Sequence, residues 1–339
     1  MAKKKKMKFA AIGLGWIFNT QKWIFRLLKR AEIVAIVDKN EDLAKRRAKG
    51  LRVPWFTSSK QLYENEVDFD AVYIATPHHL HAPLMKEAIE HKKHIFCDKP
   101  ITHTIEDAEE VIKLAKENDI KIGINYQYRY DPKVYSLVQA CHENLLGKIL
   151  YGKVEVPWYR DRKYYEQGKW RKYWKSAGGG TLLIHASHSI DVLLWALGNP
   201  KSIMGKYDTR LHRDLGVEVE DVGMGIIEFK SGALVQVLST ACTKPKKGIV
   251  RIEIYGENGA LKYKGPWPLS YLRWYGIQRK RYRLDTDGFI VFSKILNGFI
   301  DWVWYDKKFY STAETALTTL KTVLGIYRSS NLKKEIIIP

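Results

Sequence analysis

Short apolar runs alternate with longer amphipathic stretches over the first 125 residues, and this alternation constrains the fold more than any other feature. Apolar runs that predict strands lie at residues 9–12, 33–37, 71–75, 94–97 and 121–124. Stretches with the spacing of amphipathic helices lie between them, at residues 16–29, 41–49, 83–91 and 105–118. Strands that alternate with helices of this length form right-handed βαβ units around a parallel sheet. We therefore expect an α/β domain with a doubly wound parallel sheet over residues 1–125.

The pattern changes after residue 125. Consecutive strands are expected at residues 222–229, 233–242, 250–255 and 260–263, with turn residues Ser231-Gly232 and Asn258-Gly259 between them. Helices are expected at residues 132–146, 187–197 and 312–329. Neighbouring strands with tight turns form antiparallel sheets. Residues 126–339 are therefore expected to form an α+β domain with a large, open, mostly antiparallel sheet.

The turn after the first strand has the pattern of a nucleotide site. Gly13 and Gly15 stand where a dinucleotide fingerprint needs them, although Phe18 replaces the usual third glycine, so a simple packing turn remains an alternative. Asp38 ends the second strand, where a carboxylate binds ribose hydroxyls and repels a 2′-phosphate. The pattern predicts NAD as cofactor, and the neighbouring Lys39 leaves NADP possible.

Two further strands end in polar segments, at the sheet edge where cofactors bind. The third strand runs into Thr76-Pro77-His78-His79-Leu80-His81, and the fourth into Asp98-Lys99-Pro100. Three histidines in four residues are compatible with a metal site, but no carboxylate or cysteine nearby completes a ligand set, so we expect no metal. Lys99 is either a surface charge or a catalytic group.

These motifs, in this order and over nearly the whole chain from Lys8, resemble the Gfo/Idh/MocA family of nicotinamide-dependent sugar dehydrogenases. The later motifs that carry the resemblance are Gly123-Ile124-Asn125-Tyr126-Gln127, Trp170-Arg171, Gly178-Gly179-Gly180-Thr181, His188-Ser189-Ile190-Asp191, Val219-Glu220-Asp221, Glu253-Ile254-Tyr255-Gly256-Glu257 and Gly325-Ile326-Tyr327-Arg328-Ser329. The resemblance implies a Rossmann domain followed by a substrate-binding and oligomerisation domain.

The resemblance also implies roles for individual residues. Lys99 and His188 match the family's active-site lysine and catalytic histidine. The residues implied as cofactor contacts are Gly13, Gly15, Trp16, Ile17, Asp38, Lys39, Thr76, Pro77, His78, His81, Asp98, Lys99, Gln127, Trp170 and Arg171. The chain departs from the family at Ile184, where many members have aspartate, and at His78, where asparagine is usual. Without that aspartate, the chain uses Lys99 and His188 alone or recruits His185.

This assignment agrees with the chemistry of alcohol oxidation. A base must take the hydroxyl proton while hydride leaves the same carbon, and histidine titrates near neutrality. An ammonium group beside it stabilises the developing alkoxide. A zinc site at His185 and His188 lacks a convincing third ligand, because Asp191 is expected to serve the electrostatics of the helix N-terminus.

An aromatic, basic loop before the glycine triplet is the predicted substrate loop. Arginines bind phosphate or carboxylate in a bidentate fork, and aromatic rings stack on sugars or bases. The expected substrate residues are Lys99, Arg160, Arg162, Tyr164, Tyr165, Ile184, His185 and His188. The loop resembles that of members that oxidise C3 of a UDP-linked aminosugar or its uronate. A free sugar or polyol, or a non-catalytic NAD-binding regulator, remains an alternative, and the loop itself is also compatible with a solvated segment or a subunit contact.

The chain carries 57 Lys+Arg against 37 Asp+Glu, a net charge of +20. Such an excess is typical of nucleic-acid binders, and the composition is also compatible with a thermophilic protein. Most of the excess lies in residues 1–8, 158–175 and 273–283, so we expect an anionic small molecule rather than nucleic acid; the third segment fits a subunit contact or phosphate recognition. With no 18-residue apolar run and three scattered cysteines, we expect no membrane partner and a cytoplasmic location. Eight of eleven tryptophans follow residue 157, which predicts an aromatic sheet face that forms a homodimer or homotetramer.

Overall fold

The computed structural model describes residues 6–244, 248–266 and 268–338. These residues form two compact units. Unit 1 contains the described residues up to Asn125 together with Thr286–Glu314, and unit 2 contains Tyr126–Asp285 and the described residues from Thr315 onward. The segment Thr286–Glu314 lies in the part of the chain that the sequence placed in the second domain, and in the structure it packs with unit 1.

Unit 1 is built on a six-stranded parallel sheet in the order β3-β2-β1-β4-β5-β6. The strands are β1 (Met7–Ile12), β2 (Ala31–Val37), β3 (Trp55–Phe56), β4 (Ala71–Ile74), β5 (His94–Cys97) and β6 (Ile122–Ile124). The helices are α1 (Trp16–Leu27), α2 (Glu41–Leu51), α3 (Ser59–Glu64), α4 (His81–Glu90), α5 (Ile105–Glu117) and α10 (Val291–Tyr305), with a short 3-10 turn at His78–Leu80. The strand order reverses direction between β1 and β4, and open α/β sheets bind ligands at the carboxyl ends of the strands at such a point. The predicted doubly wound sheet is confirmed.

Helix α10 belongs to unit 1 because it supplies aromatic rings to the core of the parallel sheet. The ring of Phe299 lies 5.3 Å from that of Phe96 and 6.3 Å from that of Phe9. A Cβ at Gly123 would lie 2.7 Å from the Phe299 ring, so only glycine admits this ring over β6. Burial of these rings explains why a helix distant in sequence packs with the first unit.

Unit 2 is built on an eight-stranded sheet in the order β13-β12-β11-β7-β10-β9-β8-β14. Neighbouring strands are antiparallel except for β7 and β10, as expected for a mostly antiparallel sheet. The strands are β7 (Ile149–Pro157), β8 (Pro200–Asp208), β9 (Val222–Phe229), β10 (Leu234–Thr240), β11 (Val250–Gly256), β12 (Ala260–Gly265), β13 (Tyr271–Tyr275) and β14 (Ile336–Ile337). The helices are α6 (Pro132–His142), α7 (Arg162–Gln167), α8 (Trp174–Ala177), α9 (Ser187–Leu197) and α11 (Ala313–Leu332). Short helical turns lie at Gln127–Tyr130, Lys169–Lys172, Leu182–Ala186 and Arg213–Leu215.

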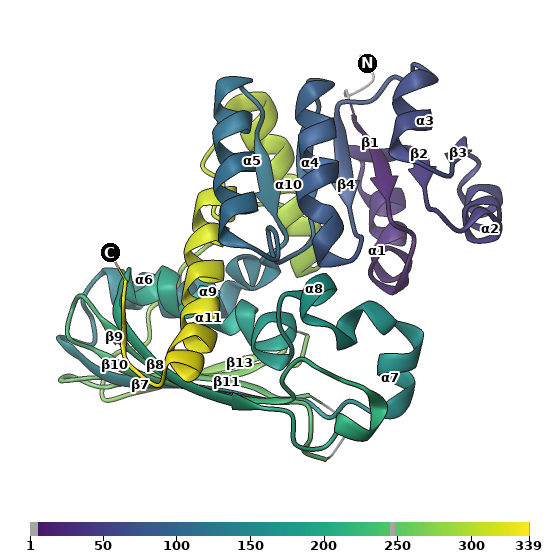
Figure 1. Cartoon of the computed structure of the whole chain (residues 1–339). Helices are drawn as coiled ribbons and strands as arrows, with labels where there is room; N and C mark the ends of the chain where they lie inside the picture. The colour runs from purple at the N-terminus through teal and green to yellow at the C-terminus, as the bar shows by residue number, and fades with distance from the viewer. Residues whose placement is uncertain (1–5, 245–247, 267, 339) are drawn as a thin grey trace. The chain divides into compact units, whose positions relative to one another are not determined.

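Within unit 2, helices α6, α9 and α11 lie over one face of the sheet (Figure 1). Along β9 and β10 buried side chains alternate with exposed ones, as a sheet covered on one face requires. Exposed apolar side chains on these strands include Met224, Ile226 and Leu234. The tryptophans described in this half are spread over the fold: Trp274 lies on β13 of the sheet, Trp195 on α9, and Trp302 and Trp304 on α10 of unit 1. The strand register places Tyr151, Tyr255, Tyr271 and Tyr275 on the same face as Leu234, so this face carries tyrosines as well as aliphatic side chains.

One helical stretch, Trp174–Leu197, is long and apolar enough to cross a membrane by length and composition. It contains no run of 18 consecutive apolar residues, since Lys175, His188 and Asp191 interrupt it. In the structure 78% of its most apolar window is buried inside the fold. A buried core helix passes the same test, and α9 is a core helix of unit 2.

Candidate active site

The glycine turn between β1 and α1 leaves space for a ligand. Gly13 has φ +90°, and a Cβ there would lie 2.7 Å from the carbonyl oxygen of Ala75, so both the backbone and the close approach require glycine. Among the described residues no atom lies within 4 Å of a Cβ built on Gly15, at the start of α1. Helix N-termini bind phosphates through free amides. Trp16 is 70% exposed and Ile17 half-buried, so their backbone opens the helix while the indole faces outward.

Asp38 fixes this turn. Its Oδ2 accepts a hydrogen bond from the Leu14 amide at 2.8 Å, and its Oδ1 accepts one from the Asn40 amide at 2.9 Å. A carboxylate offers about four lone pairs, so both oxygens keep capacity for ribose hydroxyls. The sequence predicted the ribose role of Asp38 and missed its bond to the turn. Lys39 is exposed beside it.

His81 joins the two polar segments at the ends of β4 and β5. It is fully buried, its Nδ1 lies 2.8 Å from the Pro100 carbonyl oxygen, and its Nε2 lies 3.1 Å from that of Thr76. Burial lowers the pKa of His81 to about 4, although the hydrogen bonds to these carbonyl oxygens oppose the shift. The structure thus gives His81 a supporting place beneath Thr76 and Pro77, and His78 is buried next to it.

Buried polar atoms without a partner mark the same edge of the sheet. Among the described residues Thr76 Oγ1 and Asn125 Oδ1 are buried and accept or donate no hydrogen bond. The Asn125 amide nitrogen donates to Asp98 Oδ1 at 3.0 Å, and burial raises the pKa of Asp98 against the opposing charge of Lys99. Buried polar groups are rarely left unpaired, so these atoms indicate a missing polar ligand. A dinucleotide would fit these groups, and Gly15 and Asp38 are the residues predicted to hold its pyrophosphate and its ribose.

Three of the predicted cofactor contacts lie in unit 2. Gln127 begins the helical turn Gln127–Tyr130, and Trp170 and Arg171 lie in the turn Lys169–Lys172. The remaining predicted contacts belong to unit 1. The predicted catalytic pair is divided in the same way, with Lys99 after β5 of unit 1 and His188 on α9 of unit 2.

The glycine triplet is organised by Glu220, a residue for which the sequence analysis predicted no role. The Glu220 carboxylate is 1% exposed and accepts hydrogen bonds from the Gly180 amide at 2.6 Å, the Leu182 amide at 2.8 Å and the Tyr327 hydroxyl at 2.8 Å. Burial raises the pKa of Glu220 to about 7, although these hydrogen bonds oppose the shift. A Cβ on Gly180 would overlap the Glu220 carbonyl oxygen, so position 180 must be glycine for Glu220 to come this close.

The triplet leads into the helical stretch with the predicted histidines. Ile184 and His185 lie in a π-helical turn, Leu182–Ala186, that runs directly into α9. Such turns occur often at functional sites. The His188 ring is stacked on Tyr128 with centroids 4.9 Å apart, and Tyr126 meets it edge-on at 5.6 Å. Aromatic contacts from two sides orient the predicted base.

Arg160 forms the centre of a cluster next to His185. Its Nε donates to His185 Nε2 at 3.1 Å, and its guanidinium carbon lies 4.9 Å from the Trp158 ring and 4.6 Å from the Tyr164 ring. Arg171 lies on the other rings of the loop, 4.8 Å from Tyr164 and 5.0 Å from Trp170. Two guanidinium groups held on aromatic rings form a rigid site for an anion.

Two other predicted substrate residues are directed to other partners, although the Tyr165 ring still contacts Tyr164 edge-on at 5.1 Å. Arg162 is largely exposed at the start of α7 and pairs with Glu166 at 3.7 Å and Asp214 at 3.4 Å. Tyr165 is 4% exposed in a small apolar cluster with Ala177, Val217 and Val219. Their positions in the sequence predicted that both residues belong to a substrate loop. In the structure they lie on helix α7, which directs Arg162 toward acidic neighbours and Tyr165 into the core.

Asp191 forms a buried ion pair rather than serving the N-terminus of its helix. Its oxygens accept from Arg129 Nε at 2.7 Å and Nη2 at 2.8 Å, and Thr319 Oγ1 donates to it at 3.0 Å. The bidentate pair joins the turn Gln127–Tyr130 to α9 and α11. The expectation for Asp191 is thus wrong, because the sequence could not show Arg129 as its partner.

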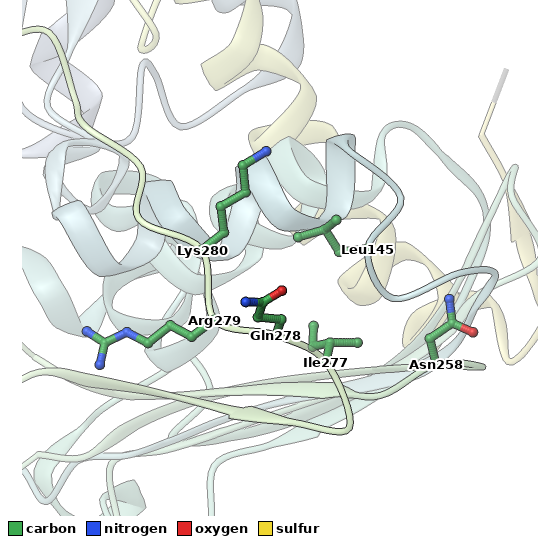
Figure 2. Close-up of a pocket in the computed structure, with 6 residues that line it drawn as sticks. All are labelled: Leu145, Asn258, Ile277, Gln278, Arg279 and Lys280. Carbon is green, nitrogen blue, oxygen red and sulfur yellow. The ribbon is translucent and has the colours of Figure 1, made fainter.

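The basic segment 273–283 lines a cavity of about 430 Å³ (Figure 2). Leu145 and Asn258 form one side, and Ile277 to Lys280 form the other, with Arg279 pointing away from Leu145 and Asn258 in Figure 2. Lys280 and Tyr282 are held by Glu143, at 2.5 and 2.7 Å. Part of the segment's charge is therefore neutralised within unit 2.

Comparison with known proteins identifies the family. Residues 7–126 match a family described as an oxidoreductase family with an NAD-binding Rossmann fold, and residues 135–262 match the GFO/IDH/MocA C-terminal domain. Levoglucosan dehydrogenase of Pseudarthrobacter phenanthrenivorans is 27% identical over 67% of this chain and 64% of its own length. The 1,5-anhydro-D-fructose reductase of Ensifer adhaerens is 30% identical over 60% of each chain. Both matches therefore span less than two thirds of the length of the relative concerned.

Solved structures show the same fold. The WlbA dehydrogenase of Bordetella pertussis, crystallised with NADH and UDP-GlcNAcA, has a TM-score of 0.89 and 24% identity over 99% of both chains. The predicted family and NAD as cofactor are confirmed by these matches. The chain belongs to the Gfo/Idh/MocA family of NAD-binding oxidoreductases.

Proposed function

We propose that this oxidoreductase transfers hydride between NAD and a secondary hydroxyl of a nucleotide-linked sugar, at C3 of a UDP-aminosugar or its uronate. The observation that carries the proposal is the Arg160 cluster. Its guanidinium is bonded to His185, which precedes the predicted base His188 by three residues on one continuous helical stretch. An anion-binding group next to the base suits a substrate with a diphosphate or carboxylate.

In this proposal His188 takes the hydroxyl proton. Its stacking on Tyr128 keeps the ring in one orientation, which is what a base needs to reach one hydroxyl. Lys99 stabilises the developing alkoxide with its ammonium group. Bound NAD supplies the hydride acceptor. Arg160, Arg171 and the rings of Tyr164 and Trp170 hold the anionic part of the substrate.

Because Ile184 replaces the aspartate of many family members, His185 is a candidate for an additional catalytic group. We propose a different role for His185. An arginine Nε can only donate, so His185 Nε2 accepts and the ring is neutral in this arrangement. A nitrogen that accepts from Arg160 cannot take a substrate proton at the same time. His185 therefore orients Arg160, and His188 remains the base.

The relatives support this substrate class at different levels. Levoglucosan dehydrogenase and anhydrofructose reductase are named for uncharged sugars, whereas WlbA was crystallised with UDP-GlcNAcA. A free sugar or polyol is thus the second candidate. The two candidates differ in whether the arginines are needed.

A substrate panel tests the proposal. UDP-N-acetylglucosamine uronate, UDP-N-acetylglucosamine, glucose, inositol and levoglucosan are each incubated with enzyme and NAD, and NADH is followed at 340 nm. We expect turnover of a UDP-sugar with kcat/KM about 100-fold or more above every free sugar, and inhibition by UDP. Equal or better turnover of a free sugar would establish the second candidate, and NAD binding without any turnover would indicate a regulator.

We also propose that the enzyme is a cytoplasmic homodimer or homotetramer assembled through the uncovered face of the unit 2 sheet. Met204, Met224, Ile226, Leu234 and Tyr151 on this face are between 44% and 54% exposed. Neighbouring apolar side chains on a broad surface are typical of protein interfaces. All three cysteines are free, which suits a reducing compartment.

A further inference from the structure

His212, Asp221 and Cys242 form a buried cluster that the proposed reaction does not use. The side-chain atoms that could bind a metal lie within 4.8 Å of one another. Among the described residues this is the single group of three or more His, Cys, Asp or Glu residues with that geometry. His212 is 3% exposed and Asp221 is fully buried. Buried titratable groups in contact are costly unless they are paired, so their arrangement needs an explanation.

Both ring nitrogens of His212 are engaged. Nδ1 lies 2.8 Å from Asp221 Oδ2, and Nε2 lies 2.8 Å from the carbonyl oxygen of Arg160. A carbonyl oxygen and a carboxylate both accept, so each ring nitrogen carries a proton and the ring is an imidazolium. A metal ion would need one of these nitrogens free, which would break a bond that the fold already makes.

The charges around His212 stabilise this state. Burial disfavours the charged ring, but hydrogen bonds to Asp221, Cys242 and the Arg160 carbonyl outweigh it and raise the pKa of His212 to about 9. Tyr165 of α7 packs on the ring with centroids 4.9 Å apart. The exposed groups nearby, Arg210 and Arg213, pair with Asp208.

Asp221 is itself held rigidly. Burial disfavours its charge, but the His212 ring and the amides of Arg210 and Leu211, at 2.6 and 2.9 Å, hold the pKa of Asp221 at about 2. The His212 amide also donates to it at 3.0 Å. The carboxylate therefore stays ionised and serves as a fixed anchor for the imidazolium.

The Arg160 main chain is fixed on both sides as a result. Its amide donates to the Ala241 carbonyl oxygen at 2.8 Å, and its carbonyl accepts from His212. The side chain of the same residue donates to His185 and lies between Trp158 and Tyr164. A connected series thus runs from Asp221 through His212 and Arg160 to His185.

We propose that His212 is a positioning residue, whose ring, anchored on Asp221, holds the Arg160 backbone so that the guanidinium stays on His185 and faces the anionic part of the substrate. The effect on substrate binding rests on the proposed function. The expected change in the protonation of the His185 ring depends only on contacts within unit 2. A merely structural role of His212 would not change the protonation of His185, so this measurement distinguishes the two roles.

Nitrogen NMR of the histidine rings tests the positioning directly in the full-length enzyme. In the wild type at pH 7.5 we expect both His212 nitrogens to carry protons, and His185 Nε2 to be unprotonated. In His212→Gln and in Arg160→Ala we expect His185 Nε2 to gain a proton in part of the population. The matched control is His142→Gln, which also removes a histidine bond to a backbone carbonyl, that of Trp195, and should leave His185 unchanged.

A neutral His212 in the wild type overturns the proposal, and this measurement needs no variant to fold. An unchanged His185 in a folded His212→Gln protein overturns it as well. Binding of UDP by calorimetry then measures the functional effect. We expect the Kd for UDP to rise about tenfold or more in His212→Gln and in Arg160→Ala. The variant that combines these two substitutions should show no further rise.

Independent, multiplying effects of the two substitutions on the Kd for UDP would overturn the proposed route through Arg160. If the wild type does not bind UDP, the proposed substrate class is wrong, while the ring nitrogens of His185 and His212 still decide the role of His212.

Discussion

The Asp38 carboxylate accepts a hydrogen bond from the Leu14 amide at 2.8 Å, so the end of β2 holds the glycine turn that follows β1. One side chain therefore combines a structural bond to the turn with capacity for the cofactor ribose. Substitutions of Asp38 can separate these two roles.

Asp38→Asn keeps an acceptor for the Leu14 amide and removes the charge. We expect the Kd for NAD to rise about tenfold and the preference for NAD over NADP to fall by at least as much, since the carboxylate no longer repels a 2′-phosphate. Calorimetric titration with both cofactors measures this. Asp42→Asn, in the first turn of α2, is the control; an unchanged ratio in Asp38→Asn would count against the ribose role.

Glu220 predicts a pH-dependent stability. Its carboxyl has a pKa of about 7 in the folded chain against an ordinary 4.5, so the folded state binds more protons between these values. The stability this group contributes is present below about pH 4.5 and is lost as the pH rises to about 7. Relative to Glu220→Gln, the wild type should lose up to about 3 kcal/mol between pH 5 and pH 8. Denaturant unfolding at several pH values tests this, and a constant difference would contradict it.

The close packing of Gly180 predicts a large cost for a single methyl group. In Gly180→Ala the Cβ would overlap the Glu220 carbonyl oxygen, and we expect a loss of about 2 kcal/mol or more in the free energy of unfolding. Gly50→Ala is the matched control, because its Cβ meets no described atom within 4 Å and it lies inside α2. That variant should gain up to about 1 kcal/mol. Calorimetry compares the two, and equal changes would contradict the packing argument.

The uncovered sheet face predicts the oligomeric state. Light scattering of the wild type should give at least twice the chain mass of 39.4 kDa. Ile226→Glu, which places a charge among the exposed apolar side chains of the face, should shift the distribution toward monomer. Leu269→Glu, at a position 88% exposed outside the strands, should not. A wild-type monomer, or a dimer indifferent to Ile226→Glu, would show that this face is not the interface.

The sequence predicted unit 1 well because its parallel strands are buried on both sides and read as continuous apolar runs. Strand β8 (Pro200–Asp208) and strand β13 (Tyr271–Tyr275) escaped prediction, because their exposed sides carry lysine, arginine and tyrosine that blur the apolar signal. Helix α10 escaped because nothing local shows that its Phe299 packs on a glycine of β6.

In the candidate site, too, the sequence predicted local features and missed those that depend on distant residues. Roles set by local sequence, such as Gly13 and Asp38, could be derived from spacing, since the turn and the strand end define them. Glu220 and His212 could not, because each acts on a residue about 40 or more positions away, Gly180 and Arg160. Pairing of this kind depends on contacts between loops of unit 2 that lie outside its strands, and a single sequence does not display these contacts.

We propose His188 as the base of an NAD-dependent oxidation. The most direct measurement is stopped-flow absorbance at 340 nm with NAD and the best UDP-sugar, for the wild type, His188→Asn and the control His142→Asn. We predict that His188→Asn loses about 10²–10⁴-fold in the rate of NADH formation, with little change in the Kd for NAD. The control should match the wild type. Hydride transfer in His188→Asn at the wild-type rate would contradict the account.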